Sequence, residues 1–306
     1  MGQSDMPPTA MRGQIVAHLG VAVDVALESG ELKRVRVSRR AGHVVGDLTQ
    51  ISGERLIRLE RHSELRRRAP GRLTHQVIAA NISHLGIVTV AEPPPRIGFI
   101  DRAMILARLG NIRPFLIVNK LDQPEGQAYF EELQAIYENS CPLFGVSATS
   151  GHNMNQLRQF LAQAEPSVLI GPSGVGKSTI TNCLIPSAKL TTGALSEATG
   201  RGRHTTSVAT LQKNDDGLTL VDTPGVRDYG LIELTATELA EFFPGFEDVE
   251  HSCQFRNCRH RREPGCAVTE QANANERFAK RVALYHQLLD EVEDYEEQLK
   301  SKGQYR

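Results

Sequence analysis

GPSGVGKS, at residues 171–178, is the stretch that decides the fold of this chain. It follows the apolar run PSVLI and precedes helical sequence that ends at Leu184. A strand, a glycine-rich loop and a helix in this order are typical of a phosphate-binding P-loop and disfavour a chance glycine-rich turn. Lys177 would reach the β- and γ-phosphates, and the Ser178 hydroxyl would bind magnesium. The residues expected around the phosphates are Gly171, Ser173, Gly174, Val175, Gly176, Lys177, Ser178 and Thr179.

The nucleotide base is specified by NKLD, residues 119–122, which follows the apolar run PFLIV. The Asp122 carboxylate can accept two hydrogen bonds, from the ring N–H and the exocyclic amine of guanine. Adenine offers no such pair of donors, so a site built around Asp122 would reject it. Asn119 would join loops and contact the base, and the stem of Lys120 would cover the ring. The backbone N–H groups of Ser147 and Ala148, one βα unit later, could meet the guanine carbonyl.

Two further segments have the composition of the switch loops that sense a γ-phosphate. Asp222 begins DTPG and would hold magnesium through water, and the Gly225 N–H would contact the γ-phosphate. The stretch 185–206 is rich in Gly, Thr and Arg and lies where a first switch is expected. Thr205 or Thr206 would bind magnesium in the GTP state, with Thr205 slightly favoured. The alternative for this stretch is plain disorder.

The order of these motifs indicates a circular permutation. NKLD and the Ser-Ala pair precede the P-loop, the first switch and DTPG, whereas most small GTPases begin with the P-loop. Strands and helices alternate along this region, which predicts a mostly parallel sheet covered on both faces. The sheet can still form because the termini of compact domains often lie close together. As a consequence, the chain after the second switch runs directly into the C-terminal region.

The N-terminal part reads as a small β-barrel with a basic surface. Five short β-rich runs, QIVAH, VAVDVAL, KRVRVS, DLTQI and RLIRLE, follow one another before a linker that begins near Arg66. Their number suits an OB-like barrel, although spacing alone does not separate it from an SH3-like one. Residues 12–72 carry 13 Arg or Lys against 7 Asp or Glu. This excess is either a solvated face or a surface that meets a polyanion.

A Cys/His cluster near the C-terminus predicts a metal site. Three thiols and an imidazole lie within fourteen residues of polar loop sequence, at Cys253, Cys258, His260 and Cys266. Such a set suits one structural, tetrahedral Zn²⁺ per chain. The alternatives are three reduced thiols that lie close by chance, or His251 in place of His260. Cys141 and Cys183 are expected to be packed thiols. The cluster is also basic, as would suit RNA phosphates, through Arg256, Arg259, Arg261 and Arg262.

Composition limits the remaining possibilities. The 306 residues are 40% hydrophobic and 23% charged, as in a globular chain, and the net charge of −1 says nothing about partners. No apolar run approaches the ~20 residues that span a bilayer, and no apolar core of a secretory signal is visible. Five Cys without a disulfide pattern indicate a reduced compartment. We therefore expect a protein with no membrane partner.

The permuted order, the barrel and the Cys/His cluster together resemble the ribosome small-subunit-dependent GTPase family (RsgA, also called YjeQ). Further matches are AANISHLGIV at 79–88, GRGRHTT at 200–206 and the sequence around Cys253. The resemblance covers nearly the whole chain and favours His260 over His251 as the zinc ligand. It implies a bacterial cytoplasmic GTPase that acts late in small-subunit maturation, binds the subunit and its rRNA, and is stimulated by it. GTP with Mg²⁺ would be the substrate, GDP the product and a monomer the active form.

The resemblance includes one departure from Ras-like GTPases. Val226 follows Gly225 where those proteins place a water-orienting Gln, and the family shares this replacement. His204 is the nearest polar candidate for that role, although it could equally be a solvated residue. The catalytic candidates are therefore Lys177, Gly225 and, less firmly, His204.

The sequence thus predicts an α/β fold with a circularly permuted P-loop GTPase domain, an N-terminal OB-like barrel and a C-terminal zinc-binding helical domain. The expected boundaries are a flexible tail at 1–11, an RNA-binding OB-fold domain at 12–70, the GTPase domain at 71–232 and the zinc-binding region at 233–306. Two rival functions remain, a signalling switch with a protein effector and an RNA-binding module whose nucleotide site is vestigial. The two basic flanks argue against the first, and the intact Lys177, Ser178, Asp222 and Asp122 argue against the second.

Overall fold

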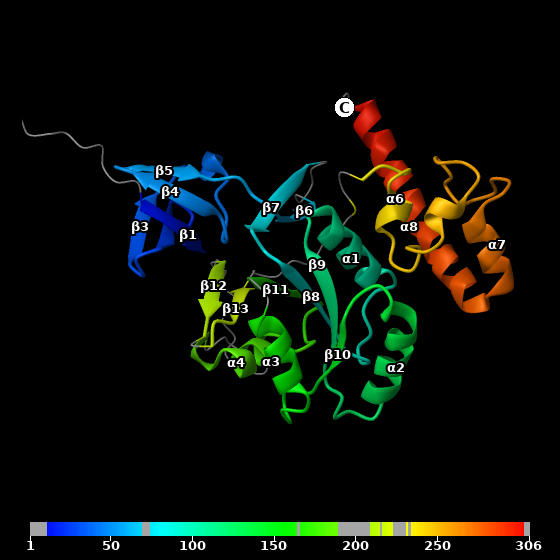
Figure 1. Ribbon diagram of the computed structural model, residues 1–306, viewed down its shortest axis with the longest axis horizontal. Coiled ribbons are helices and arrows are strands. Elements are labelled where there is room, and N and C mark those ends of the chain that lie inside the picture. The colour runs from blue at the N-terminus through cyan, green and yellow to red at the C-terminus, as the bar shows by residue number, and fades with distance from the viewer. Residues whose placement is uncertain are drawn as a thin grey trace, which may run out of the picture.

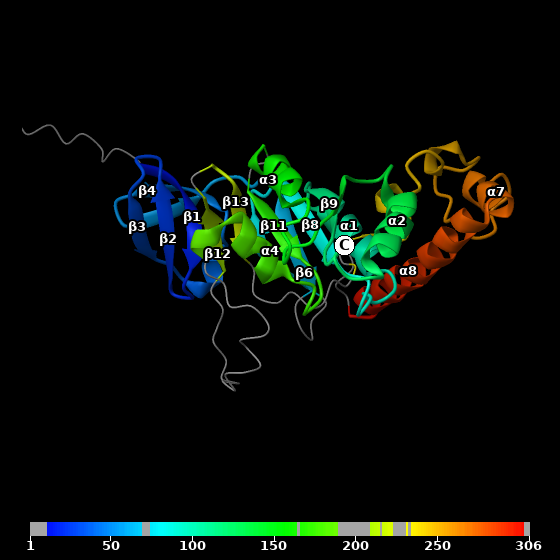
Figure 2. The same cartoon turned by 90° about the horizontal axis from the view of Figure 1, so that it is seen from below.

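The computed structural model describes residues 11–68, 74–163, 166–188, 209–214, 216–222, 231 and 234–302. His204, Thr205, Thr206 and Gly225 lie outside these residues, and so does the side chain of Asp222. The described parts form an elongated molecule, with a β-barrel at one end, an α/β domain in the middle and a helical region at the other end (Figure 1). A second view, turned by 90°, shows the same order (Figure 2). The predicted fold class is confirmed.

The barrel contains the five expected strands. They are β1 (Met11–His18), β2 (Ala22–Leu27), β3 (Leu32–Arg36), β4 (Leu48–Ser52) and β5 (Arg55–Arg58), with a short 3-10 helix at Arg39–Ala41. β1 pairs antiparallel with both β2 and β4, which in turn pair with β3 and β5. A core of alternate apolar residues, including Ile15, Val25 and Ile51, fills the interior. The strand pairing is that of the OB-like barrel.

A two-stranded hairpin connects the barrel to the α/β domain. It consists of β6 (Glu64–Arg68) and β7 (His75–Ala80). Its first strand includes Arg66, where the sequence predicted a linker, so that part of the prediction was wrong. The strand forms because its backbone pairs with β7 and because Glu64 neutralises Arg66 through an ion pair of 2.7 Å. The barrel packs tightly against β7, since a Cβ on Gly46 would lie 1.9 Å from the Ala80 carbonyl oxygen.

The central domain is a sheet in the order β10-β9-β8-β11-β13-β12, parallel except for β12. Its strands are β8 (His84–Thr89), β9 (Arg113–Val118), β10 (Leu143–Gly145), β11 (Ser167–Ile170), β12 (Thr210–Lys213) and β13 (Thr219–Asp222). Its helices are α1 (Phe99–Leu109), α2 (Gly126–Tyr137), α3 (Met154–Ala162) and α4 (Lys177–Leu184), followed by a 3-10 turn at Pro186–Ala188. β12 and β13 form an antiparallel hairpin.

Both faces of this sheet are covered. In β9, Leu116 and Val118 pack with α1 and α2, whereas Phe115 and Ile117 pack with α3 and α4. This alternation follows from the period of two along a strand. The parallel strands therefore present their carboxyl ends together at one edge, which is where ligands bind in open α/β sheets.

The C-terminal region is helical and includes α6 (Leu239–Phe242), a 3-10 turn at Glu250–Ser252, α7 (Ala267–Ala274) and α8 (Glu276–Ser301). α7 and α8 are two separate helices although the sequence from about Thr269 to Lys300 has a continuous helical pattern. Asn275 adopts an extended conformation, and its side chain accepts a hydrogen bond from the Phe278 N–H. It caps α8 and thereby separates it from α7. In the described part of the chain, no helix combines the length and apolarity needed to cross a bilayer.

Candidate nucleotide and zinc sites

The P-loop has the conformation that a phosphate site requires. It connects β11 to α4, and Gly174 and Gly176 have φ angles of 85° and 91°, a region that favours glycine. Val175 is buried and fixes the loop to the core, while Ser173 and Gly174 are exposed. The Lys177 ammonium donates hydrogen bonds to the carbonyl oxygens of Gly171 (2.8 Å) and Pro172 (2.7 Å). The lysine thus lies folded over the loop, where incoming phosphates would attract it.

Asn119 holds three separate loops in one place. Its Nδ2 donates to the Val175 carbonyl oxygen at 2.8 Å, and its Oδ1 accepts from the Ala148 N–H at 3.1 Å. The side chain is buried, and a Cβ on Gly176 would lie only 2.4 Å from its Nδ2. The P-loop, the NKLD loop and the Ser-Ala loop therefore meet at a single buried amide.

The remaining NKLD residues differ in burial, since Leu121 packs against the core, Lys120 is half-buried and Asp122 is exposed. Lys120 has a φ of 64°, which turns the chain between β9 and α2. Asp122 is exposed, and its carboxylate forms no hydrogen bond or ion pair with the residues that the structure describes. α2 begins immediately beyond the loop, and a Cβ on Gly126 would lie 2.7 Å from the Lys120 carbonyl oxygen. The structure thus leaves the Asp122 carboxylate available to a base.

The Ser-Ala loop differs in one respect from the expectation. The Ser147 N–H donates to the His152 carbonyl oxygen at 3.1 Å, and the Ala148 N–H donates to Asn119. Both donors are therefore engaged, and a guanine carbonyl would have to share the Ala148 N–H with Asn119. Cys183, expected as a packed thiol, is half-buried and contacts the Ala148 carbonyl oxygen at 3.2 Å. Cys141 is buried as expected, and burial raises the pKa of its thiol to about 12.

The magnesium and switch residues are only partly placed. Ser178 is half-buried in the first turn of α4, directly after Lys177. The backbone of Asp222 ends β13, which is hydrogen-bonded to β11, the strand that leads into the P-loop. The backbone of Asp222, the first residue of DTPG, therefore lies at the same edge of the sheet as Ser178.

The Cys/His cluster has the geometry of a zinc site. The ligand atoms of Cys253, Cys258, His260 and Cys266 all lie within 4.8 Å of one another. The Cys253 and Cys266 sulfurs are 3.9 Å apart, and each lies 3.5 Å from the His260 Nδ1. Zn–S and Zn–N bonds of about 2.3 and 2.0–2.1 Å in a tetrahedron would separate these atoms by about 3.8 and 3.5 Å. The cluster is therefore compatible with a structural zinc.

The surroundings hold these ligands in position. Cys266 caps α7, and its sulfur accepts a hydrogen bond from the Thr269 N–H. His260 adopts a φ of 57°, and its carbonyl oxygen lies 2.8 Å from the His286 Nε2. The Glu263 carboxylate accepts three backbone N–H groups, from Arg259, Arg261 and Arg262. Sequence reasoning missed Glu263, and the only signal was an acid within an otherwise basic loop.

Two of the four loop arginines are already paired. Arg259 forms an ion pair with Glu293, and Arg261 forms ion pairs with both Asp290 and Glu293. The acids belong to α8, so the acidic run 290–297 anchors the zinc loop. Arg259 and Arg261 are therefore engaged within the protein, and the suitability of this loop for RNA phosphates stays a prediction. Within the described chain, Arg256 and Arg262 form no ion pair.

The buried Asn119 joins a P-loop to a guanine-type NKLD loop at the carboxyl edge of a parallel sheet, with NKLD first in the chain. This arrangement defines a circularly permuted P-loop GTPase. A family model described as "RsgA GTPase" matches residues 58–232, more than half of the chain. The chain therefore belongs to the RsgA GTPase family, a family of GTP hydrolases. A second model, "50S ribosome-binding GTPase", matches residues 167–302, starting at β11.

Individual relatives agree with this family. The chain is 38% identical over 292 residues to a "Small ribosomal subunit biogenesis GTPase RsgA" from Azotobacter vinelandii, covering 90% of this chain and 84% of the relative. A protein of the same name from Actinobacillus pleuropneumoniae serotype 5b is 33% identical over 312 residues, covering 97% and 90%.

Solved structures show the same architecture. YjeQ from Thermotoga maritima has a TM-score of 0.71 and 27% identity, and the match covers 92% of this chain and 99% of YjeQ. YloQ, described as a circularly permuted GTPase, has a TM-score of 0.69 over 96% of this chain and 98% of its own. At 22% identity the likeness to YloQ supports the fold alone.

Proposed function

We propose that this GTPase binds the small ribosomal subunit and assists its late maturation, hydrolysing GTP to GDP and phosphate with stimulation by the subunit. The observation that carries the proposal is the buried Asn119, because it makes the P-loop and NKLD loop a single nucleotide site. The names of the relatives supply the partner. The same proposal includes rRNA as the surface bound, a monomer as the active form, a cytoplasmic location and no membrane partner.

The residues would share the chemistry as follows. Lys177 would leave the Gly171 and Pro172 carbonyl oxygens for the β- and γ-phosphates, where it stabilises the charge that develops during transfer. Ser178 would bind Mg²⁺, and Asp122 would accept the guanine N–H groups. Asp222, Gly225 and Thr205 or Thr206 would complete the γ-phosphate contacts in the switches.

Intrinsic turnover should be slow because Val226 cannot orient the attacking water. We assign this role to His204, which the subunit would place by ordering the first switch. The domain boundaries at 12–70, 71–232 and 233–306 belong to the same proposal, with the first and last domains acting as RNA-binding flanks.

The barrel has cations available for RNA. Arg34 is neutralised by Asp24, and Arg61 is held in a buried network with Asp47 and Glu64. Several other basic residues of the barrel form no ion pair with any described residue, namely Arg12, Lys33, Arg36, Arg40 and Arg55. A local excess of positive charge therefore persists after the internal pairs are formed, as a phosphate-binding surface requires.

GTP turnover with purified small subunits, large subunits or neither tests the proposal. The small subunit should accelerate hydrolysis and the large subunit should not. Lys177→Ala should abolish turnover under all conditions, and His204→Ala should lose the stimulated rate while it still binds GTP. A signalling switch would show no acceleration by either subunit, and a vestigial site would show no turnover at all.

A further inference from the structure

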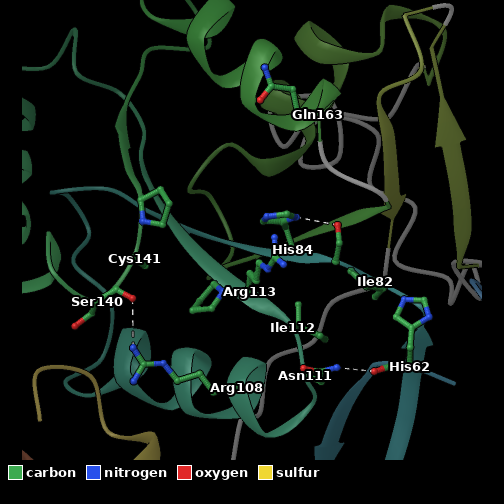
Figure 3. Close-up of a pocket in the computed structure, with 13 residues that line it drawn as sticks. His62, Ile82, His84, Arg108, Asn111, Ile112, Arg113, Ser140, Cys141 and Gln163 are labelled. Atoms are coloured by element: carbon green, nitrogen blue, oxygen red, sulfur yellow. Dashed lines mark hydrogen bonds between the residues drawn. The ribbon is translucent and has the colours of Figure 1, made fainter. Parts of the chain in front are cut away.

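A cleft of about 800 Å³ opens at the amino edge of the parallel sheet, where no nucleotide-site residue lies (Figure 3). His84 at the start of β8 and Arg113 at the start of β9 line it, together with Arg108 near the end of α1. β8 runs six residues from this edge to the nucleotide edge. At about 3.3 Å per residue, about 20 Å separates the two sites. The volume lies within the range of roughly 300–1,000 Å³ that ligand sites occupy.

The charge of the lining is one-sided. The lining contains two arginines and two histidines but no Asp or Glu. Arg108 is held by Glu247 and by the Ser140 and Phe242 carbonyl oxygens, so it forms part of the wall. Arg113 is exposed, and its guanidinium forms no ion pair with any described residue. It is therefore the cation that the fold leaves without a counter-charge in this cleft.

A histidine lies beside Arg113 at the same edge of the sheet. His84 packs edge-on against the rings of Phe115 and Phe160, and its Nδ1 lies 2.8 Å from the Ser83 hydroxyl. Burial, and then the positive charge of Arg113, lower the pKa of His84. The lowered pKa favours the neutral form of His84, so Arg113 carries the positive charge at this edge.

The rim of the cleft is polar and accessible. His62, Asn111, Gln163 and Arg113 are exposed at its edge. The close-up shows His62 and Asn111 on one side, Gln163 on the opposite side and Arg113 between them (Figure 3). The Asn111 Nδ2 donates to the His62 carbonyl oxygen at 2.9 Å, which fixes one side of the rim. Arginine with amide and imidazole donors is the set that proteins use for phosphate oxygens. An open rim of this kind admits a polymer as well as a small anion.

We propose that this cleft binds a backbone phosphate of an RNA strand, with Arg113 as its principal cation. The inference deepens the proposed rRNA-binding role by adding a contact on the GTPase domain itself, between the two basic flanks. The bound group is a phosphate, which could belong to an RNA backbone or be free inorganic phosphate. We assign the RNA strand because Arg113 lies at an exposed rim.

The test is fluorescence anisotropy with a labelled single-stranded RNA oligonucleotide at about 50 and about 200 mM KCl, with GDP and Mg²⁺ saturating the P-loop. Arg113→Gln should weaken RNA binding roughly 5- to 20-fold. The slope of the logarithm of the association constant against the logarithm of the salt concentration should become shallower by about 0.7, the value for one phosphate contact to a single strand. Arg113→Lys should recover most of the affinity, because it keeps the charge. A melting temperature equal to that of the wild type would establish that Arg113→Gln is folded.

The control is Lys280→Gln, which removes one exposed cation from α8 and should leave both affinity and slope unchanged. Equal RNA affinity and equal salt slope for Arg113→Gln and the wild type would overturn the proposal. Binding of inorganic phosphate to the wild type but not to Arg113→Gln, with equal RNA affinity for the two proteins, would assign the cleft to a free anion instead. Because the assay uses a free oligonucleotide, its failure leaves the subunit-stimulated turnover test intact.

Discussion

Asn119 and Asp122 have different tasks although they belong to the same four-residue loop. Asn119 is buried, and both the nitrogen and the oxygen of its amide form hydrogen bonds within the protein. Asp122 is exposed, and its carboxylate has no partner in the described chain. Asn119 holds the loops of the site together, and we propose that Asp122 selects the base. Substitutions at the two positions should therefore have distinct effects.

Asn119→Ala should weaken both GDP and GTP binding by roughly 10- to 100-fold. The Val175 carbonyl and the Ala148 N–H would each lose a buried hydrogen bond, at about 1–3 kcal/mol. Titration with a fluorescent GDP analogue measures the effect. Gln134→Ala, which removes an exposed amide on α2, is the control and should bind normally. Unchanged affinity in Asn119→Ala would show that the loops are held by other contacts.

Asp122→Asn should remove the preference for guanine over adenine nucleotides without disrupting the fold. The amide replaces one acceptor oxygen by a donor, so it can no longer accept both guanine N–H groups. Competition of GTP and ATP for the same site measures the preference. A variant that retains the wild-type ratio would refute the assignment of Asp122 to the base.

At the scale of elements, the zinc loop and α8 depend on each other. The loop is fixed by the proposed metal at one end and by Glu293 of α8 through Arg259 and Arg261 at the other. A loop this polar has little apolar surface to bury, so metal binding contributes directly to its folding. The metal ligands and α8 should therefore form a single stability unit.

Cys258→Ser should lose most of its zinc and unfold its C-terminal region at a lower temperature than the wild type. Elemental analysis and thermal unfolding measure the two effects. Cys183→Ser, which alters a thiol outside the cluster, should retain zinc. Full zinc occupancy in every one of the four single-ligand variants would show that the metal is bound elsewhere.

α8 is also fixed to the GTPase domain by a buried arginine. The Arg281 guanidinium forms an ion pair of 2.6 Å with Asp101 of α1 and lies over the rings of Tyr137 and Phe243. It also donates to the Pro244 carbonyl oxygen. Tyr137 ends α2, the helix that begins after the NKLD loop. The guanine loop and the zinc region are thus connected through α2 and α8.

Arg281→Met should lower the free energy of unfolding by about 3–5 kcal/mol, because it leaves the buried Asp101 carboxylate without its counter-charge. The neighbouring Lys280→Met is the matched control. Its exposed pair with Glu276 should contribute no more than about 0.5 kcal/mol. Urea unfolding measures both values. Equal midpoints for the two variants would mean that Arg281 stabilises the domain contact no more than a surface residue does.

The sequence was most informative where one short motif determines a local conformation. The five barrel strands, the P-loop and the order of the motifs follow from local patterns, and so does the grouping of the zinc ligands. The pairing of Arg261 with Asp290 could not be predicted, because the partners are 29 residues apart and meet only through folding. The β6 strand could not be predicted for the same reason. Its sequence, ELRRR, lacks the alternation of apolar and polar residues that marks a strand, and it forms by pairing with β7.

At the scale of the molecule, each flank adjoins a segment expected to act as a switch. The barrel strand β1 pairs with β12 through Ala17 and Thr210, and the His18 N–H donates to the Ala209 carbonyl oxygen at 3.3 Å. β12 begins at Thr210, a few residues after the predicted first switch at 185–206. The C-terminal region begins after DTPG. The two flanks lie at opposite ends of the molecule (Figure 1). If the two segments act as switches, each flank would be connected to the nucleotide through a different one.

This arrangement predicts that the nucleotide controls how firmly both flanks contact rRNA at once. Two weak phosphate-binding surfaces on one scaffold gain affinity through effective concentration, and they lose it when the geometry forbids simultaneous contact. Ordered switches would favour simultaneous contact, and hydrolysis would remove it. A coupling of about 1–3 kcal/mol corresponds to a roughly 5- to 150-fold difference in affinity.

The affinity for small subunits, measured with a non-hydrolysable GTP analogue and with GDP at two salt concentrations, tests this account most directly. We expect roughly 5- to 150-fold tighter binding with the analogue, and steep weakening with salt in both states because phosphate contacts release counterions. Equal affinities in the two nucleotide states would contradict the account, because GTP hydrolysis would then have no effect on release from the subunit.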